Sequence, residues 1–491
     1  MHRELTHHKL HQTLKLRAHG ARLPPGPKTA KTGLAKPWLY FRELSAQYGD
    51  VVSVPGLSSN PTIVLGSARA AWDLLERRGA VYSSRPRFVV GGELLSGGMR
   101  GLMAPYGDFL APLAQAAPLG LHAAPERRLE SAVLVRDLLK DPGCFREHLE
   151  RYAASVIVLV TYGRRVTDVA SDEVVRRNVE AMGRLTSVNI PGKYAAERYP
   201  ALKYIPAMFA PWKAEVLKQR QKDIQLYMDL LNDIKDKVAR GVATPCFTTH
   251  LLEEQGALGI LPTPLARRSV QTAGTLASFF LACVKFGHNF IPRAQEELDR
   301  IVGRDRLPAF EDMEELEYVR AIASETFRWR PVAVLGGTPH ASTADDVYNG
   351  MFIPKGSTII APLWTIHLNE KDFPEPHEFK PERFLEQRDF PGTLGHTAFG
   401  WGRRICPGAH LGAASVNLNI ARILWAFNVT PAKDETGQDI DVDIFAFTDG
   451  FNSSPLPFPC SILPRSQYHA EVVRRTHEEA VNELKVFDSS R

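Results

Sequence analysis

One cysteine, Cys406, lies in a glycine-punctuated run from Phe399 to Gly408, directly before an apolar stretch that favours a helix. Glycines let the backbone turn tightly and come close to a flat ligand. The N-terminus of the following helix favours the anionic form of a cysteine sulfur. Such a sulfur can ligate the iron of heme. The run therefore predicts a metal-binding thiolate, and the alternative is a structural cysteine in an ordinary loop.

The order Phe399-x-x-Gly402-x-Arg404-x-Cys406-x-Gly408 resembles the heme-binding signature of the cytochrome P450 family, with every fixed position filled. The resemblance implies the cytochrome P450 fold, which is mainly α with small β-sheets and holds a single heme between the central helix and the helix after the cysteine. It also implies that Cys406 is the axial ligand of the heme iron, and that the other four residues of the signature contact this cofactor.

A glutamate and an arginine, Glu325 and Arg328, lie three residues apart on a stretch whose apolar spacing predicts a helix. This separation puts both on one side of the helix, where they can form a bidentate pair that survives burial if another cation completes it. The phrase from Phe379 to Phe384 resembles the family's Pro-Glu-Arg-Phe element, whose arginine is Arg383 here. The resemblance implies a structural triad that locks the cysteine loop.

The connection after this helix, from Val332 to His340, lines the substrate cavity in the resembled family and donates a cation to a heme propionate. His340 is the matching candidate for a cofactor contact, with Arg404 as the second. The alternative is a turn histidine that bonds to the backbone. By resemblance, apolar residues within Phe88 to Met103 and within Phe445 to Phe451 are further candidate pocket walls.

The segment that corresponds to the family's central helix, Gln271 to Cys283, departs from the family pattern. The family motif there is Ala-Gly-x-Asp/Glu-Thr-Thr, whose acid and threonine relay protons during oxygen activation. The present segment contains Ala273-Gly274 and threonines but no carboxylate. The group that normally supplies the proton is therefore missing from the segment.

Two alignments of this motif are open. One counts back without a gap from Phe279 and places Val270 at the acid, Gln271 at the first threonine and Thr272 at the second. The other matches Ala273-Gly274 to the motif's own Ala-Gly, which leaves about six residues missing around Thr275 and shortens the helix by roughly 9 Å. We favour the second, in which the helix does not cross the heme in the usual way. Thr272 and Thr275 are thus alternative candidates for the catalytic threonine.

A second departure follows Tyr106-Gly107, where the family tends to have Tyr-Gly-x-x-Trp-Arg. The Trp and Arg that normally meet a heme propionate fall on Leu110 and Ala111. One charge-assisted anchor is missing, which costs about 1.5–3 kcal/mol of cofactor binding. Arg87 and Arg100 are basic residues nearby in the sequence.

The composition is that of a globular enzyme, with 44% hydrophobic and 23% charged residues in 491. Five scattered cysteines without a Cys-x-x-Cys pair disfavour a disulfide framework and a structural zinc site. No apolar run of about 18 residues predicts a membrane-spanning helix, and the start of the chain lacks the apolar core of a secretory signal. We expect a basic arm and proline hinge over residues 1–28 and a single catalytic domain over residues 29–491.

The net charge of +5 is a property of the N-terminus, because eight Lys or Arg and a single acidic residue lie within residues 1–40. A basic arm can lie against anionic lipid or nucleic acid, although a solvated tail is the commoner case. We find no nucleic-acid module. By family resemblance we expect the cytosolic face of the endoplasmic reticulum. Peripheral membrane contact and a soluble cytoplasmic protein are both open.

Local patterns also predict several elements. A helix is expected from Trp38 to Tyr48, followed by strands at 50–54 and 62–65 between Gly and Pro turns. Pro292 and Gly303 match the preferred ends of a helix, so we expect one helix to begin at Pro292 and to end at Gly303.

The resemblance implies a heme-thiolate monooxygenase that oxidises an apolar small molecule in fungal secondary metabolism. Hydroxylation is the oxidation that we expect. It would use O2 and electrons from NADPH through a reductase partner. Two alternatives are open. One is a heme-thiolate protein without the usual O2 activation, acting as an isomerase, a dehydratase or a binding protein, and the missing carboxylate motivates it. The other is an inactive chain whose sequence reflects wrong exon choices.

Overall fold

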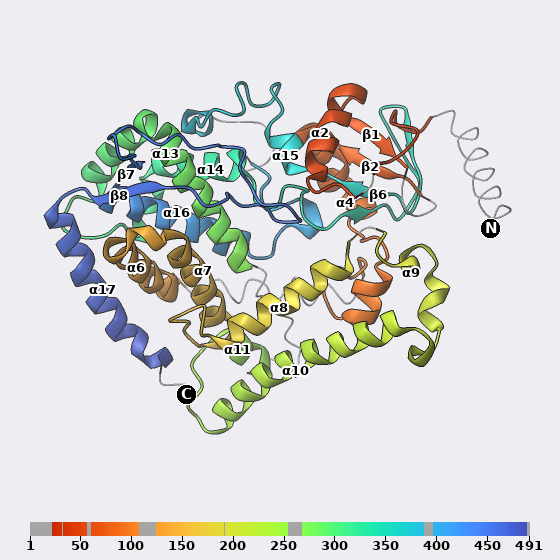
Figure 1. The fold of residues 1–491 in the computed structure, drawn as a ribbon, viewed down its shortest axis with the longest axis horizontal. Coiled ribbons are helices and arrows are strands. Elements are labelled where there is room, and N and C mark those ends of the chain that lie inside the picture. Colours follow the sequence, from red (N-terminus) through yellow and green to blue (C-terminus); the bar gives the residue numbers. More distant parts are fainter. Residues whose placement is uncertain are drawn as a thin grey trace.

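Helices make up most of the fold, and small β-sheets complete it (Figure 1). The structure is a computed structural model that describes residues 22–31, 33–55, 60–107, 124–190, 192–253, 268–386 and 396–488. The expected class, mainly α with small β-sheets, is confirmed. Most of the predicted basic arm lies outside the described residues.

Nine helices of the described residues have at least three turns: α2 (Pro37–Tyr48), α6 (Ala124–Lys140), α7 (Phe145–Tyr162), α8 (Glu173–Val188), α10 (Pro211–Ala239), α13 (Arg268–Ile301), α14 (Glu317–Trp329), α16 (Ala409–Ala426) and α17 (Gln467–Asp488). The shorter α-helices are α3 (Ala68–Ala71), α4 (Gly79–Tyr82), α9 (Ala195–Arg198), α11 (Phe247–Glu253) and α15 (Leu363–His367). Two π-helices, η1 (Trp72–Arg77) and η2 (Val89–Leu95), and the 3-10 turns η4 (Pro142–Cys144), η5 (Pro200–Tyr204), η6 (Ala207–Phe209), η7 (Phe310–Glu314), η8 (Pro381–Phe384) and η9 (Gly402–Arg404) complete the helical elements.

A four-stranded sheet packs beside α2, α4 and α15 (Figure 1). Its strand order is β1 (Val51–Val54), β2 (Thr62–Leu65), β6 (Thr358–Ile360) and β3 (His340–Ala341), where β2 and β6 run parallel and the other neighbours antiparallel. Two antiparallel pairs of strands are separate: β4 (Asp346–Tyr348) with β5 (Met351–Ile353), joined by a tight turn, and β7 (Phe427–Pro431) with β8 (Cys460–Pro464), joined by a long connection. The helix and both strands predicted near the N-terminus are confirmed.

The largest core cluster joins α6, α7, α13, α14 and α16. Phe279 and Phe280 of α13 are fully buried, and the ring of Phe280 lies 4.9 Å from that of Phe145 on α7. Helix α16 is buried on nearly all sides, and its buried polar side chains include Asn419 and Arg422, which donate to the backbone carbonyls of Ser415 and Pro308. The cysteine loop therefore leads directly into a helix of the largest core cluster.

Helix α13 is continuous through Pro292, so the prediction that a separate helix begins there is wrong. Proline inside a helix removes one backbone hydrogen bond and costs about 3 kcal/mol. The residues around it, Phe290, Ala294 and Leu298, are fully buried, and their packing holds the helix together. The helix ends at Ile301, and Gly303 follows with a positive φ of 75°, which is the terminator that the sequence predicted.

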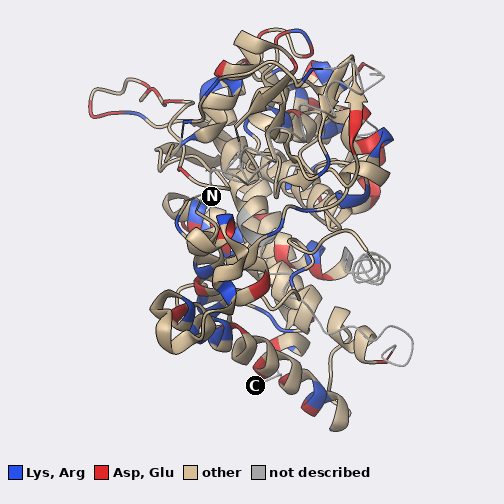
Figure 2. Cartoon of the chain, turned by 90° about the vertical axis from the view of Figure 1, so that its right-hand side faces the viewer, with Lys and Arg blue, Asp and Glu red and all other residues tan. Residues whose placement is uncertain are grey.

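Charged residues of both signs are interspersed over the helices in the side view, and neither sign dominates that side (Figure 2). No described helix combines the length and the hydropathy that crossing a membrane requires.

Candidate active site

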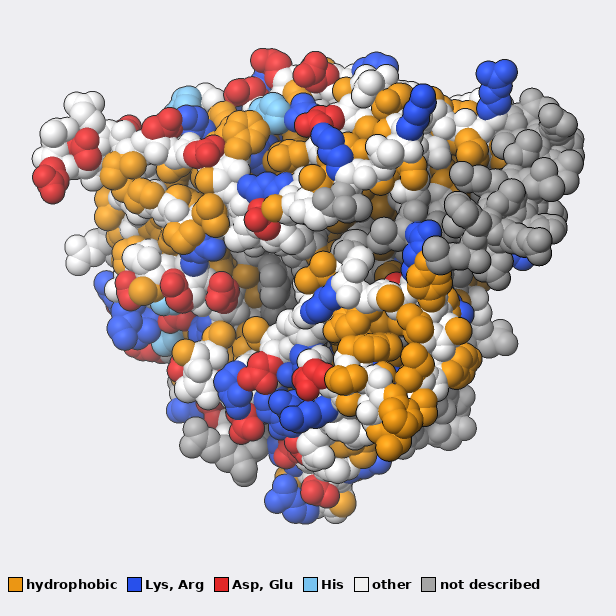
Figure 3. Space-filling view, turned by 45° about the vertical axis from the view of Figure 1, so that its right-hand side comes forward, with side chains coloured by type: hydrophobic (Ala, Val, Ile, Leu, Met, Phe, Trp, Pro, Cys, Tyr) orange, Lys and Arg blue, Asp and Glu red, His pale blue; other side chains and the backbone are white. Residues whose placement is uncertain are grey.

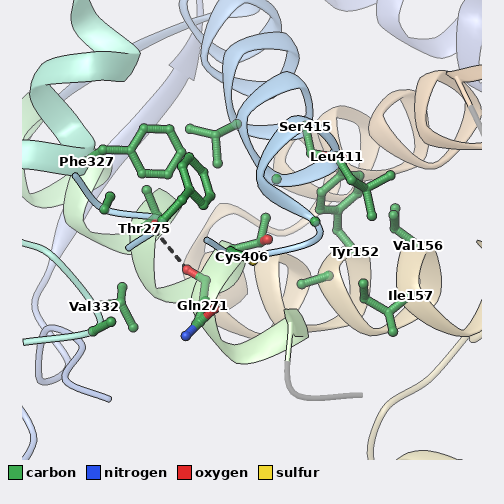
Figure 4. A pocket seen from close by; sticks show the side chains of 18 residues that line it. Tyr152, Val156, Ile157, Gln271, Thr275, Phe327, Val332, Cys406, Leu411 and Ser415 are labelled. Carbon is green, nitrogen blue, oxygen red and sulfur yellow. Dashed lines mark hydrogen bonds between the residues drawn. The ribbon is translucent and has the colours of Figure 1, made fainter. Parts of the chain in front are cut away.

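A cavity opens between α7, the first turns of α13, the residues after α14, the cysteine loop and the start of α16 (Figure 4). The space between the lining atoms amounts to about 740 Å³, counting the part open to solvent. The lining residues are Tyr152, Ala153, Val156, Ile157, Gln271, Thr272, Thr275, Phe327, Val332, Ala333, Ala398, Phe399, Cys406, Gly408, Leu411, Gly412, Ser415 and Val416.

Cys406 is fixed by the backbone of its own loop. Its N–H donates to the carbonyl of Phe399 at 2.8 Å, and its carbonyl accepts from the N–H of Ala409, the first residue of α16, at 3.0 Å. Gly402 has a positive φ of 53°, and a side chain there would overlap the carbonyl oxygen of Leu75. The glycine at this position is therefore required by both conformation and space.

Arg404 ties the cysteine loop to a distant part of the chain. Its guanidinium donates to the carbonyls of Ser83 at 2.8 Å, Gly101 at 3.2 Å and Ala104. Burial lowers the pKa of Arg404 to about 10, so the side chain is still charged at neutral pH. A second tie is the N–H of Gly402, which donates to a carboxylate oxygen of Glu76 at 2.6 Å.

Glu325 and Arg328 form a bidentate ion pair with both side chains fully buried. The Nε and Nη2 atoms of Arg328 donate to the two carboxylate oxygens at 2.6 and 2.7 Å. The remaining Arg328 donor, Nη1, is satisfied by the carbonyls of His367 and Pro376, both at 2.9 Å. The pair therefore holds the chain after α15 in place through backbone contacts.

Arg383 completes this cluster. Its Nε lies 3.5 Å from a Glu325 carboxylate oxygen, and its Nη2 donates to the carbonyl of Glu375 at 2.9 Å. The same oxygen of Glu325 accepts from the N–H of Lys380 at 2.9 Å. The structure thus brings together the three side chains that the sequence assigned to one triad.

The triad connects to the cysteine loop through α15. His367, whose carbonyl Arg328 holds, accepts hydrogen bonds at Nε2 from the hydroxyl and the N–H of Thr397, at 2.8 and 3.2 Å. The Thr397 carbonyl in turn accepts from the N–H of Gly400 at 2.9 Å. On the other side of α14, the ring of Phe327 lies 5.0 Å from that of Phe399. Two contiguous contact paths therefore run from the buried ion pair to the loop of Cys406.

A sequence model of the family described as cytochrome P450 matches residues 269–450. A cytochrome P450 monooxygenase of Armillaria gallica is 34% identical, over 94% of this chain and 94% of its own length. Cytochrome P450 monooxygenase 58 of Postia placenta is 34% identical, over 90% of this chain and 89% of its own length. This chain belongs to the cytochrome P450 family. A solved zebra fish cytochrome P450 with abiraterone shares the fold, with a TM-score of 0.67 at 21% identity over 88% of this chain and 100% of that chain.

The cofactor of this cytochrome P450 is heme bound through a cysteine thiolate. The described walls of the cavity fit that group, because Cys406 supplies the one sulfur and most other lining side chains are apolar. Gly408 and Gly412 line the same side without side chains, which leaves room for a flat ring. No charged side chain is among these lining residues, so the partners of the heme propionates come from outside this set.

The central helix brings both candidate threonines to the cavity. Gln271, Thr272 and Thr275 line it from the first two turns of α13, and Thr275 Oγ1 donates to the carbonyl of Gln271 at 2.8 Å (Figure 4). A Cβ on Gly274 would come within 3.1 Å of Val332 and 3.3 Å of Ser454, so this position packs closely against both residues. The two alignments of the family motif both stay predictions. The shortening of the helix relative to the family stays a prediction.

The structure places His340, the predicted propionate contact, beside the guanidiniums of Arg85 and Arg404. It is buried in β3, and its Nδ1 donates to the carbonyl of Tyr82 at 2.8 Å. Burial, with help from the nearby charges of Arg85 and Arg404, lowers the pKa of His340 to about 3. The hydrogen bond to Tyr82 is the contact that the backbone-bonded alternative expects, and the contact with a heme propionate stays a prediction.

The basic residues around the predicted propionate anchor divide into two sets. Leu110 and Ala111 lie outside the described residues. Arg87 pairs with Glu93, and Arg100 pairs with Asp223, so both of these arginines are engaged elsewhere. The two guanidiniums beside His340, those of Arg85 and Arg404, donate to backbone carbonyls. The residues that contact the heme propionates stay a prediction.

Several lining residues escaped the sequence analysis. Tyr152 and Val156 come from α7, and Leu411 and Ser415 come from α16. Each pair has the four-residue spacing that puts two side chains on one helix face, which was the available signal. Of the predicted walls, Val332 and Ala333 line the cavity, whereas the lining residues include none from within Phe88 to Met103 or Phe445 to Phe451 among the described residues.

We expect Glu325→Ala to abolish heme incorporation. The change leaves the guanidinium of Arg328 buried without its counter-ion, which costs roughly 3–5 kcal/mol in buried ion pairs. Heme incorporation is measured by the ratio of heme to protein absorbance in the purified variant, and its stability by the thermal unfolding temperature. The matched control is Glu317→Ala, an exposed glutamate on the same helix, which should load heme normally. A stable Glu325→Ala variant with normal heme content would contradict the structural role of the triad.

Acidification is expected to destabilise the fold through buried histidines such as His396. Burial lowers the pKa of His396 to about 3, whereas an unfolded histidine titrates near about 6.5. Between these values the unfolded chain binds a proton that the folded chain excludes. The stabilisation is therefore complete above about pH 6.5 and is lost as the pH falls toward 3, at up to about 1.4 kcal/mol per pH unit.

The variant His396→Phe keeps a ring against Phe327, which now stacks on the imidazole at 4.9 Å, and removes the titrating group. We expect a shallower fall of the unfolding temperature between pH 7 and pH 5 than in the wild type. His288→Phe, at an exposed histidine of α13, is the control and should keep the wild-type slope. An unchanged slope in His396→Phe would rule out this source of acid sensitivity.

Proposed function

We propose that this cytochrome P450 inserts one oxygen atom into an apolar small molecule, in fungal secondary metabolism, with O2 and electrons from NADPH delivered by a reductase. The single observation that supports this is Cys406 in the wall of a cavity whose other walls are mostly apolar. Its relatives are fungal monooxygenases of the same family. An apolar cavity favours an apolar substrate because binding removes apolar surface of both from water.

In this proposal the cavity residues have different roles. Cys406 binds the iron, and the heme when bound supplies the metal that activates O2. Side chains such as Val332 and Ala333 exclude water and hold the substrate by apolar contact. Thr272 and Thr275 are the candidates for holding a proton at Oγ1 near the iron. The hydroxyl hydrogen of Thr275 points to the Gln271 carbonyl, which leaves its oxygen able to accept a hydrogen bond from the cavity.

The first test is the spectrum of the reduced carbon monoxide complex, since thiolate ligation gives a distinctive red-shifted Soret band. We expect this band from the wild type and its loss in Cys406→Ala. Cys144→Ala, at an exposed free cysteine, is the matched control and should keep the band. A Cys406→Ala variant that still gives the red-shifted band would remove Cys406 from the ligand role.

The second part of the test adds a reductase and NADPH, and follows NADPH oxidation with and without an apolar ligand. Oxidation that depends on the ligand and yields an oxygenated product supports the monooxygenase. The cavity lining includes no carboxylate among the described residues. A thiolate band with ligand conversion that needs neither NADPH nor O2 would therefore favour the isomerase or dehydratase role.

The proposal includes peripheral contact with a membrane at the cytosolic face of the endoplasmic reticulum. Three side chains in the segment of η5 and η6 are among the most exposed large hydrophobic residues of the described chain, with Tyr204 at 75%, Met208 at 80% and Phe209 at 72% exposure. Hydrophobic side chains gather on the side of the molecule where this segment follows α9 (Figures 1 and 3). Exposed apolar clusters of this kind mark interaction surfaces.

Flotation with phosphatidylcholine vesicles tests the contact. We expect the double variant Met208→Ser and Phe209→Ser to float less than the wild type, because it removes apolar surface that would enter the lipid. The matched control changes two exposed valines elsewhere, Val242→Ser and Val486→Ser, and should float as the wild type does. Equal loss of flotation in both double variants would contradict a specific contact at Met208 and Phe209.

A further inference from the structure

Polar side chains are few in the cavity, and they lie on two sides of Cys406. Tyr152 and Ser415 lie on one side, and Gln271 lies on the other, near Val332 (Figure 4). Tyr152 lies close to the side chains of Ser415 and Asn419, so its hydroxyl faces polar neighbours. The polar groups on the side of Tyr152 thus have polar neighbours within the protein, whereas the side of Gln271 has fewer of them.

The carboxamide of Gln271 makes no hydrogen bond with any side chain or backbone group in the described part of the chain. Only the backbone carbonyl of Gln271 is engaged, as the acceptor for Thr275. The side chain is half-buried, in contrast to Thr275, which is 6% exposed. A ligand that covers this amide removes the water bound to it. Unless the ligand supplies a hydrogen bond in place of that water, the loss makes binding weaker.

We propose that Gln271 is the subsite for an uncharged oxygen of the substrate, and that the preferred substrates are apolar molecules with one hydroxyl or carbonyl group. This inference rests on the proposed function. The amide offers a donor at Nε2 and an acceptor at Oε1, so it can pair with a hydroxyl in either role and with a carbonyl as donor. An apolar wall with one placed polar group is the usual means by which a site orients its ligand.

The charge of the cavity narrows the class further. Apart from the Cys406 thiolate, which the heme iron binds, none of the lining residues within the described chain carries a formal charge. A carboxylate or an ammonium group would therefore lose its water without gaining an ion pair, whereas a neutral oxygen needs only the amide. A pure hydrocarbon would remove water from the Gln271 amide without offering a hydrogen bond in its place. The expected order of preference is thus alcohol or ketone first, then hydrocarbon, then carboxylate.

Binding titrations test this without turnover. Purified, heme-loaded protein in the ferric state is titrated with 1-adamantanol and with adamantane, and the ligand-induced Soret shift gives each dissociation constant. The ratio of the two constants is compared between the wild type and Gln271→Leu, so that the different solubilities of the probes cancel. We expect Gln271→Leu to weaken the relative affinity for the alcohol by roughly 3- to 10-fold, the size of one hydrogen bond, with adamantane bound as well or better.

Val332→Ala is the matched cavity control, because it removes apolar contact near Gln271 without removing a polar group. It should weaken both probes and leave their ratio unchanged. Gln271→Glu keeps the acceptor at nearly the same size and should retain part of the alcohol preference. An unchanged ratio in Gln271→Leu, or an equal loss of both probes, would overturn the subsite. The carbon monoxide band and ligand-dependent NADPH oxidation of Gln271→Leu would then still report on the proposed function separately.

Discussion

The buried ion pair between Glu325 and Arg328 is the interaction on which the site depends. Both side chains are fully removed from solvent, and two charges without water are stable only if nearly every donor and acceptor is satisfied. Here the partners are mostly backbone groups, including the carbonyls of His367 and Pro376 and the N–H of Lys380. The chain from α15 to η8 therefore cannot shift without leaving a charge unpaired. The pair thus fixes a long irregular segment that has little regular secondary structure of its own.

Two sets of contacts hold the cysteine loop in its conformation, one with this segment and one with residues 76–104. Thr397 joins it to His367 of α15, whereas Arg404 and Gly402 join it to residues 76–104 on the other side. The loop contains only a short 3-10 turn, so these contacts replace the regular hydrogen bonding that would otherwise hold it. The sulfur of Cys406 is placed by elements far apart in the sequence. This explains why arginine and glycine, rather than apolar residues, occupy so many positions of the loop.

The parts of the site that follow from local chemistry could be predicted from the sequence. Spacing along one helix puts Glu325 beside Arg328, and a tight turn needs Gly402, so both follow from residue type and order. His340 could not be assigned in this way. Its neutrality depends on burial and on the charges of Arg85 and Arg404, one about 250 residues earlier and the other after it in the chain. The continuity of α13 through Pro292 also depends on packing partners that the local pattern does not contain.

The orientation of α13 decides how the missing carboxylate should be understood. The helix presents Gln271, Thr272 and Thr275 to the cavity, while Gly274 packs toward Val332 and Ser454. The polar groups nearest the first turns are instead an amide and two hydroxyls, all uncharged. Such groups pass or hold protons only with a partner, and an oxygen atom carried by the substrate is a partner that the cavity can accommodate.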